Sequence, residues 1–444
     1  MKDHTYHIVT YGCQMNKNDS QRLESILAGM GLVPALTIIE ADVIILTSCS
    51  VRESAESRIF GQTNNFLALK EKNPEVIIAV TGCMPGRDKD GAMKKKLSGV
   101  DLYFPTKDMV NLPLWLSQLN PALRPMEDPE KDYLSIRPTY RRAFQAFATL
   151  QTGCNHFCTY CVVPYARGLE VNRPVADILA EIRDLVHRGC REVTLLGQIV
   201  NHYLAPQPEQ FSTANPYAKN HFAKLLWEIN QISGLERVHW TAPHPLYMDD
   251  EAIDALTLPK QVNYIHLPAQ SGNTEVLRRM NRRHTREQYL DIIQKIRSKK
   301  PSLAIGTDII VGFCGETAAQ FMDTVSLYRL ADFDISYHAQ YSSRSGTLAE
   351  KIFSDDVPRE EKKRRWDALQ ELMEETTYRK NQAYLDGEVS VLVDERRGEW
   401  LEGNSREMKR VRFKGSTDLV GTIQQIRIFK ADTWMLWGNL VGQS

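Results

Sequence analysis

The chain has 444 residues, 42% apolar and 25% charged, which is enough for two to four globular domains of ordinary composition. Its 55 basic and 55 acidic residues cancel, so a nucleic-acid-binding surface can only be a local patch. The N-terminus lacks a secretory signal, and no apolar run approaches the roughly 18 residues of a membrane span. We therefore expect a cytoplasmic protein with no membrane partner, in which eight cysteines indicate metal binding or catalysis.

The first 110 residues repeat one pattern three times. Each repeat is a short β-branched run ending in a small residue and then cysteine, and the runs occupy residues 7–13, 41–49 and 76–83. With a fourth strand at 99–104 and helices or turns between, the pattern predicts an open parallel sheet. Ligands bind at the carboxyl ends of strands in such sheets, so we expect Cys13, Cys49 and Cys83 to converge.

After a proline-rich linker at 117–140, strands and helices alternate again. The helix predicted at 176–189 has apolar residues at the 3.6-residue period and Gly189 as its C-terminal cap. Six strands are predicted, at residues 147–153, 192–198, 237–242, 264–270, 305–313 and 335–342. Six such units form an incomplete parallel barrel with its site at the C-terminal mouth.

The C-terminal part changes character. Residues 358–384 predict a long charged helix, and the strands that follow, with turns at Gly403, Gly415 and Gly421, predict a five-stranded barrel. The predicted fold is therefore α/β in three domains: an open parallel α/β domain at 1–119, a partial (β/α)6 barrel at 140–376, and a small all-β, OB-like barrel at 377–444.

Cys154, Cys158 and Cys161 lie within eight residues. They provide three thiolates, one fewer than the irons of a 4Fe–4S cluster, and an open coordination position is typical of a metal that acts on a substrate. A zinc site with His156 as fourth ligand is the alternative, but zinc sites more often have two Cys-x2-Cys pairs. We predict an open cluster here. A second is predicted at the three N-terminal cysteines, for which buried structural thiols are the alternative.

The stretch GCNHFCTYCVVPYARG at 153–168 resembles the cluster loop of the radical S-adenosylmethionine superfamily. The resemblance implies that S-adenosylmethionine binds the open iron and is cleaved by one electron to methionine and a 5′-deoxyadenosyl radical. YGCQMNKNDS at 11–20, TSCSVRESAE at 47–56, HLPAQSGN at 266–273 and TDIIVGFCGET at 307–317 extend the resemblance, over essentially the whole chain, to the methylthiotransferases.

Within that family, YGCQMNKNDS most resembles the MiaB-type tRNA methylthiotransferases, and the C-terminal barrel resembles the RNA-binding TRAM domain. The resemblance implies transfer of sulfur and methyl to C2 of N6-isopentenyladenosine at position 37, in the tRNA anticodon loop. The alternatives are the sister enzyme acting on threonylcarbamoyl-adenosine, the ribosomal-protein aspartate methylthiotransferase, and a non-enzymatic iron–sulfur RNA-binding protein.

The two predicted 4Fe–4S clusters suggest two tasks. The resemblance implies that one generates the radical, while the other holds sulfur on its free iron. S-adenosylmethionine then serves as methyl donor and as radical source, and the implied partners besides tRNA are an electron-donor protein and an iron–sulfur carrier. A radical carries the hard step because an sp2 C–H bond has no acidity that a side-chain base can use.

Further polar residues are expected around the cofactor. Gln198 and Asn201 follow the second barrel strand, where the superfamily binds the methionyl amino group, and Gln270 and Ser271 end the fourth strand, within reach of the ribose or methionyl part. Asp308 lies in an apolar run, so it needs a ligand or a partner, for which Arg167 and Arg173 are candidates. We interpret four histidines and one cysteine as structural: His239, His244, His266, His338 and Cys190.

Two basic runs are candidate RNA surfaces. Residues 278–286 contain five arginines, and residues 396–414 contain seven basic against three acidic residues. Trp434 and Trp437 are candidates for stacking on bases, although solvated faces and barrel core are the simpler interpretations. The chain departs from the family pattern at five positions, none a predicted cluster ligand: Leu169, Ile199, Cys314, Ser343 and Ser345.

Overall fold

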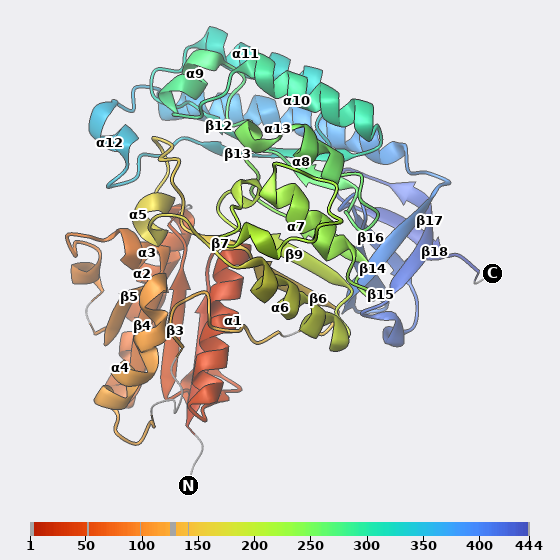
Figure 1. The fold of residues 1–444 in the computed structure, drawn as a ribbon. Helices are drawn as coiled ribbons and strands as arrows, with labels where there is room; N and C mark the ends of the chain where they lie inside the picture. The colour runs from red at the N-terminus through yellow and green to blue at the C-terminus, as the bar shows by residue number, and fades with distance from the viewer. Residues whose placement is uncertain (1–3, 51–52, 98, 125–129, 141, 443–444) are drawn as a thin grey trace. The chain divides into compact units, whose positions relative to one another are not determined.

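The computed structural model describes residues 4–50, 53–97, 99–124, 130–140 and 142–442, and its chain divides into two compact units (Figure 1). Unit 1 comprises Met1–Arg141, Gln151–Val171 and Arg344–Leu348. Unit 2 comprises Arg142–Leu150, Asn172–Ser343 and Ala349–Ser444. The loop with Cys154, Cys158 and Cys161 therefore belongs to the same unit as the N-terminal cysteines. None of the described helices has the length and apolar character needed to cross a membrane.

Unit 1 is built on a five-stranded parallel sheet in the order β2–β1–β3–β4–β5. The central strands β3 and β4 are buried throughout, as expected for parallel strands rich in Val and Ile that carry no charged residue. The strands are β1 (Thr5–Thr10), β2 (Val33–Pro34), β3 (Val43–Ser48), β4 (Ile77–Gly82) and β5 (Leu102–Pro105). The helices of this part are α1 (Gln14–Gly29), α2 (Glu53–Lys72), α3 (Cys83–Arg87) and α4 (Leu112–Leu119).

Unit 2 contains the six predicted barrel strands, as two parallel sheets of three strands ordered β6–β9–β10 and β11–β12–β13. The strands are β6 (Gln145–Thr149), β9 (Glu192–Leu196), β10 (Arg237–Trp240), β11 (Tyr264–His266), β12 (Ala304–Val311) and β13 (Ile335–Gln340). The helices are α6 (Val175–His187), α7 (His221–Asn230), α8 (Asp250–Ala255), α9 (Thr274–Arg279), α10 (Arg286–Lys299), α11 (Ala318–Ala331), α12 (Leu348–Ile352) and α13 (Arg359–Gln382). Gly189, at φ 95°, lies just beyond the end of α6, as expected for a residue that closes a helix.

Five strands close a barrel after α13, in the order β14–β15–β16–β18–β17. Neighbouring strands are antiparallel except for the parallel pair β16 and β18. They are β14 (Glu388–Arg397), β15 (Trp400–Ser405), β16 (Arg410–Lys414), β17 (Ile423–Ala431) and β18 (Leu436–Leu440), around a core of Val, Leu, Ile and Phe. The predicted α/β fold class with a small C-terminal β-barrel is therefore confirmed. The turn predicted at Gly403 is wrong, because Gly403 lies inside β15 opposite Val393, where the register of β14 shifts, and the turn is at Gly398.

One buried arginine ties this barrel to the sheets of unit 2. Arg237 of β10 is 1% exposed and donates to the carbonyl oxygens of Asn404 (2.9 Å) and Ser390 (2.7 Å). Its guanidinium lies 3.8 Å from the carboxylate of Glu192, on the neighbouring strand. Burial raises the pKa of Glu192 and lowers that of Arg237, so each charge depends on the other.

We predict that Arg237→Leu lowers the free energy of unfolding by about 3–5 kcal/mol, because it leaves a buried carboxylate and two carbonyls without their cation. Thermal unfolding followed by circular dichroism measures the change. Lys295→Leu, which removes exposed ion pairs with Asp250 and Asp291, is the control and should cost less than about 1 kcal/mol. Equal effects of the two substitutions would contradict the role assigned to Arg237.

Candidate functional site

The three N-terminal cysteines lie at the carboxyl edge of the unit 1 sheet. Thr10, Thr47 and Thr81 are in register on β1, β3 and β4, and a cysteine follows each strand within three residues. Cys13 caps the N-terminus of α1, Cys49 follows β3, and Cys83 is the first residue of α3. A Cβ atom on Gly12 would lie 2.9 Å from the Cβ atom of Cys49, so the first two cysteine-bearing loops touch.

Side-chain hydrogen bonds hold these strand ends together. The Asn16 Oδ1 atom accepts from the backbone nitrogen of Cys13 at 3.2 Å and lies 3.4 Å from its Sγ, while Nδ2 donates to the carbonyl oxygen of Ser48 at 3.2 Å. The hydroxyl of Ser48 in turn donates to the carbonyl oxygen of Thr81 at 2.6 Å. One chain of contacts therefore runs across all three strands that carry the cysteines.

The second triad lies on the loop between β7 (Gln151–Thr152) and α5 (Val163–Arg167) of unit 1. Cys154 and Cys158 are buried and Cys161 is half-buried. Backbone N–H groups of His156 and Val163 donate to the Sγ atoms of Cys154 and Cys161, at 3.5 and 3.4 Å. Such donors stabilise thiolates, so the residues fit an iron–sulfur cluster.

Among the described residues, no three His, Cys, Asp or Glu side chains are grouped around a point where a single metal ion would bind. A 4Fe–4S cluster does not need such a group, since each thiolate binds a different iron of the cube. The zinc alternative would require it, with His156 completing the cysteine triad.

A buried ion pair joins the two cysteine-bearing regions. Arg167, which ends α5, donates from Nη2 to Asp19 Oδ2 at 2.5 Å and from Nη1 to Oδ1 at 3.3 Å. The two side chains are 3% and 0% exposed, and the hydroxyl of Tyr133 donates to Asp19 at 2.7 Å. Burial raises the pKa of the Cys83 thiol, and the Arg167 guanidinium opposes this shift. Arg167 therefore favours a thiolate on the other triad.

The backbones of α3 and α5 also approach closely. A Cβ atom on Gly86 would lie 2.0 Å from the carbonyl oxygen of Ala166, so only glycine permits the contact. Figure 1 shows α5 beside α3, which begins with Cys83. Sequence reasoning missed Asp19, Arg167 and Gly86 as parts of this site; the sequence signals are the Asp inside YGCQMNKNDS and the Arg that ends the cysteine loop.

Two predicted cofactor residues of unit 2 lie after β9. The Oε1 atom of Gln198 is buried and has no hydrogen-bond partner among the described residues, so it can accept from an amino group. Asn201 is 3% exposed, and its amide exchanges hydrogen bonds with the backbone of His244, at 2.8 and 3.0 Å. The geometry therefore gives Asn201 the task of holding the His244 loop, while its contact with a cofactor stays a prediction.

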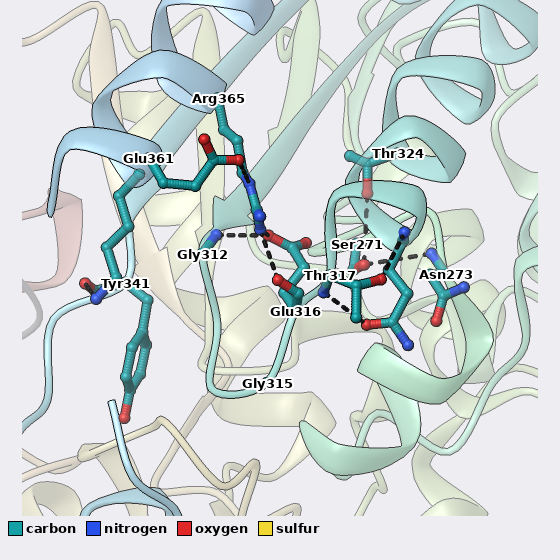
Figure 2. Close-up of polar contacts among 12 residues, drawn as sticks. Ser271, Asn273, Gly312, Gly315, Glu316, Thr317, Thr324, Tyr341, Glu361 and Arg365 are labelled. Atoms are coloured by element: carbon teal, nitrogen blue, oxygen red, sulfur yellow. Dashed lines mark hydrogen bonds and ion pairs between the residues drawn. The ribbon is translucent and has the colours of Figure 1, made fainter. Parts of the chain in front are cut away.

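Gln270 and Ser271 lie at the turn after β11. Gln270 has φ 65° and pairs with β12, since its nitrogen donates to the carbonyl oxygen of Asp308 at 2.8 Å. The buried Ser271 hydroxyl lies 3.5 Å from that of Thr324 and accepts from the nitrogen of Asn273 (Figure 2). Both residues are positioned by backbone and hydroxyl contacts of the barrel.

Asp308 does not have the environment predicted for it. Its carboxylate is 41% exposed and lies 3.0 Å from Nε2 of His266, whose Nδ1 is 3.0 Å from the hydroxyl of Tyr264. The two arginines proposed as its partner bind other carboxylates: Arg167 pairs with Asp19 and Arg173 with Glu181. The prediction failed because the apolar neighbours of Asp308 in sequence alternate with it across the strand, and His266 approaches from β11.

The acidic residue of the FCGET stretch is a buried polar residue that the sequence analysis did not single out. The Oε2 atom of Glu316 accepts from the nitrogen of Gly312 (2.6 Å) and from Arg365 (2.8 Å), as Figure 2 shows, while Oε1 is buried without a partner among the described residues. Burial raises the pKa of Glu316. Its sequence signal was a carboxylate directly after a glycine-containing turn that ends a barrel strand.

Two of the residues interpreted as structural, His239 and Cys190, have pKa values shifted by burial. Burial lowers the pKa of His239 to about 4, with a further contribution from His266, so its imidazole is neutral at pH 7. Cys190 is 1% exposed, its Sγ lies 3.2 Å from the carbonyl oxygen of Glu192, and burial raises its pKa to about 12. The raised pKa keeps Cys190 a neutral thiol at pH 7, which is a poor nucleophile.

Comparison with known proteins places this geometry in a family. The family model described as the radical SAM superfamily matches residues 149–328, and that described as the uncharacterized protein family UPF0004 matches residues 5–105. In fold, the chain is similar to the radical S-adenosylmethionine methyltransferase TsrM from Kitasatospora setae, with TM-score 0.55, 12% identity and coverage of 76% of this chain and 72% of that one.

Curated relatives cover nearly the whole chain. The chain is 40% identical to tRNA-2-methylthio-N(6)-dimethylallyladenosine synthase from Caldicellulosiruptor saccharolyticus, over 99% of this chain and 93% of the relative. It is 39% identical to the synthase of that name from Clostridium botulinum, over 98% and 96%. The resemblance seen in the cysteine motifs is thus confirmed, and the chain belongs to the tRNA-2-methylthio-N(6)-dimethylallyladenosine synthase family of radical SAM enzymes.

Proposed function

We propose that this chain is a radical transferase that inserts sulfur and a methyl group at C2 of N6-isopentenyladenosine, next to the anticodon of tRNA. The family to which it belongs carries this activity in its name, and relatives at 38–40% identity cover almost the full chain. The observation that carries the proposal is the placement of two three-cysteine sites in one compact unit, joined by the Asp19–Arg167 pair.

The family uses 4Fe–4S clusters and S-adenosylmethionine. When bound, these groups supply a carbon-centred radical that removes hydrogen from an unactivated C–H bond. We propose that Cys154, Cys158 and Cys161 hold the cluster that binds S-adenosylmethionine, and that Cys13, Cys49 and Cys83 hold the second cluster. Each triad provides three thiolates, which leaves one iron open for a cofactor or for sulfur.

Four polar residues of unit 2 are proposed to orient the cofactor. We propose that Gln198 accepts from the methionyl amino group, because its buried Oε1 atom lacks a partner among the described residues. Gln270 and Ser271 are proposed to face the ribose or methionyl part, from the turn after β11. Asp308, exposed on β12 and paired with His266, is proposed to contact the ligand as well.

We further propose that the anticodon loop of tRNA is the segment bound, since its unpaired adenosine can leave the stack and enter a pocket. An electron-donor protein must supply the electron, and an iron–sulfur carrier is proposed to load the two sites. A tRNA substrate supports a cytoplasmic location. The sister activity on threonylcarbamoyl-adenosine is the competing possibility, because the cysteine sites alone do not distinguish it.

Anaerobically reconstituted protein should contain about eight irons per chain, and the Ala variant of Cys154, Cys158 and Cys161 about four, since each site holds one cluster. Iron analysis and absorbance measure the difference. Cys314→Pro and Cys190→Ala are controls that should keep about eight irons, because both cysteines lie outside the triads. A folded triple variant without iron, or loss of half the iron in Cys314→Pro, would overturn the ligand assignment.

Replacing Cys13, Cys49 and Cys83 by Ala should preserve cleavage of S-adenosylmethionine but abolish methylthiolation, because the radical-generating site keeps its ligands. Chromatography of 5′-deoxyadenosine and of the nucleoside product measures the two steps separately. Formation of the normal methylthio nucleoside by this variant would refute the division of labour.

The substrate itself is tested in cells. In a strain that lacks this gene, mass spectrometry of tRNA nucleosides should show isopentenyladenosine without its methylthio derivative, and the wild-type gene should restore the derivative. Cys158→Ala, expressed at the same level, should fail to restore it. Loss of methylthio from threonylcarbamoyl-adenosine instead would assign the chain to the sister activity.

A further inference from the structure

Most of the charge in the basic run at 396–414 is neutralised within unit 2. Arg410 forms ion pairs with Asp394 (2.7 Å), Glu402 (3.1 Å) and Glu395, and Arg412 donates to Glu402 at 2.8 Å. Three further cations pair with carboxylates: Lys414 with Glu399, Lys409 with Asp334, and Arg397 with Glu395. The remaining two donate to backbone carbonyl oxygens, Arg406 to those of residues 259 and 261 and Arg396 to that of Gly398. This run is therefore a weak candidate for binding phosphates.

A different surface lies on the next two strands of the barrel. In the strand register, Trp437 of β18 lies between Arg412 of β16 and Lys430 of β17. The Lys430 Nζ atom lies 4.6 Å from the centroid of the Trp437 ring. Among the described residues, no carboxylate lies within ion-pair distance of this ammonium group. The ammonium group of Lys430, which lies over the aromatic ring, is therefore available to bind an external anion.

A β-bulge widens this surface. The register of β17 shifts between Ile428 and Lys430, so two successive side chains, Phe429 and Lys430, both face solvent. Phe429 is 53% exposed, although strict alternation along the strand would allow only one of the two residues to face outward. The bulge thus places a large aromatic ring next to a cation on the outer face.

A third aromatic side chain is presented by the turn between β17 and β18. Trp434 is 55% exposed, and the Asp432 carboxylate fixes its turn by accepting from the nitrogens of Trp434 and Met435, both at 2.9 Å. Asn381 at the end of α13 donates to the carbonyl oxygens of Asp432 (2.8 Å) and Thr433 (3.1 Å). The exposed indole is therefore carried by a braced turn.

We propose that Phe429, Lys430, Trp434 and Trp437, here called the aromatic face, bind unpaired bases of the substrate tRNA by stacking, with Lys430 contacting phosphate. The inference rests on the proposed tRNA substrate and identifies the surface that holds it. Exposed rings combined with an unpaired cation are the features by which proteins bind single-stranded nucleic acid without reading its sequence. An apolar protein partner would need no such cation.

The test uses the full chain, with fluorescence anisotropy on a labelled anticodon stem-loop and on whole tRNA. Phe429→Ala with Trp434→Ala should weaken binding at least about tenfold, because each lost stacking contact is substantial. KM for tRNA should rise while kcat and iron content stay unchanged. Phe429→Tyr with Trp434→Phe should bind like wild type. Leu330→Ala with Tyr378→Ala, which also removes two exposed apolar side chains, is the matched control and should have no effect.

If the wild-type enzyme is active and the Phe429/Trp434 double Ala variant binds tRNA with unchanged affinity, the proposed role of the aromatic face is wrong. A larger loss in Arg410→Gln than in that variant would also overturn it, in favour of the basic run. If wild-type enzyme neither binds nor modifies tRNA, the proposed function fails instead, which distinguishes the two failures. The double Ala variant is also tested on a blunt RNA duplex. If its loss of affinity for the duplex equals its loss for the stem-loop, stacking on unpaired bases is contradicted.

Discussion

The buried ion pair between Asp19 and Arg167 is the constraint on which the arrangement of unit 1 depends. Removing two charges from water costs several kcal/mol for each ion, so the pair is tolerated only with near-ideal geometry. Two hydrogen bonds between the partners, and a third from Tyr133, provide that geometry. Because Asp19 belongs to the helix after Cys13 and Arg167 to the helix after Cys161, displacement of either loop would leave a buried charge unpaired.

This constraint explains why the cysteine loop at 151–171 belongs to unit 1, although the strand before it and the helix after it belong to unit 2. The close approach of Gly86 to Ala166 also holds the cysteine loop in unit 1, since it brings the helix that begins with Cys83 against the helix that follows the second triad. The chain thus holds both sets of thiols on one body.

Much of the fold was predictable because its signals are local. The β-branched runs ending at Cys13, Cys49 and Cys83 identified the sheet and its functional edge, and the glycine- and strand-rich tail identified the barrel. The failures all involve contacts between distant residues. The partner of Asp308 is a histidine on the neighbouring strand, and Gly403 lies opposite a bulge rather than in a turn. The basic run at 396–414 contains as many charges as predicted, but a count along the sequence does not reveal the carboxylates that pair with Arg410 and Arg412, and its role as an RNA surface stays a prediction.

The separation of Asp19 and Arg167 along the chain has a consequence for synthesis on the ribosome. The two residues are 148 positions apart, so at about 5–20 residues per second the carboxylate is made roughly 7–30 s before its guanidinium. During that interval the N-terminal sheet cannot bury Asp19 without leaving its charge uncompensated. Burial of Asp19 as a carboxylate is therefore favoured only after the second cysteine loop has been made.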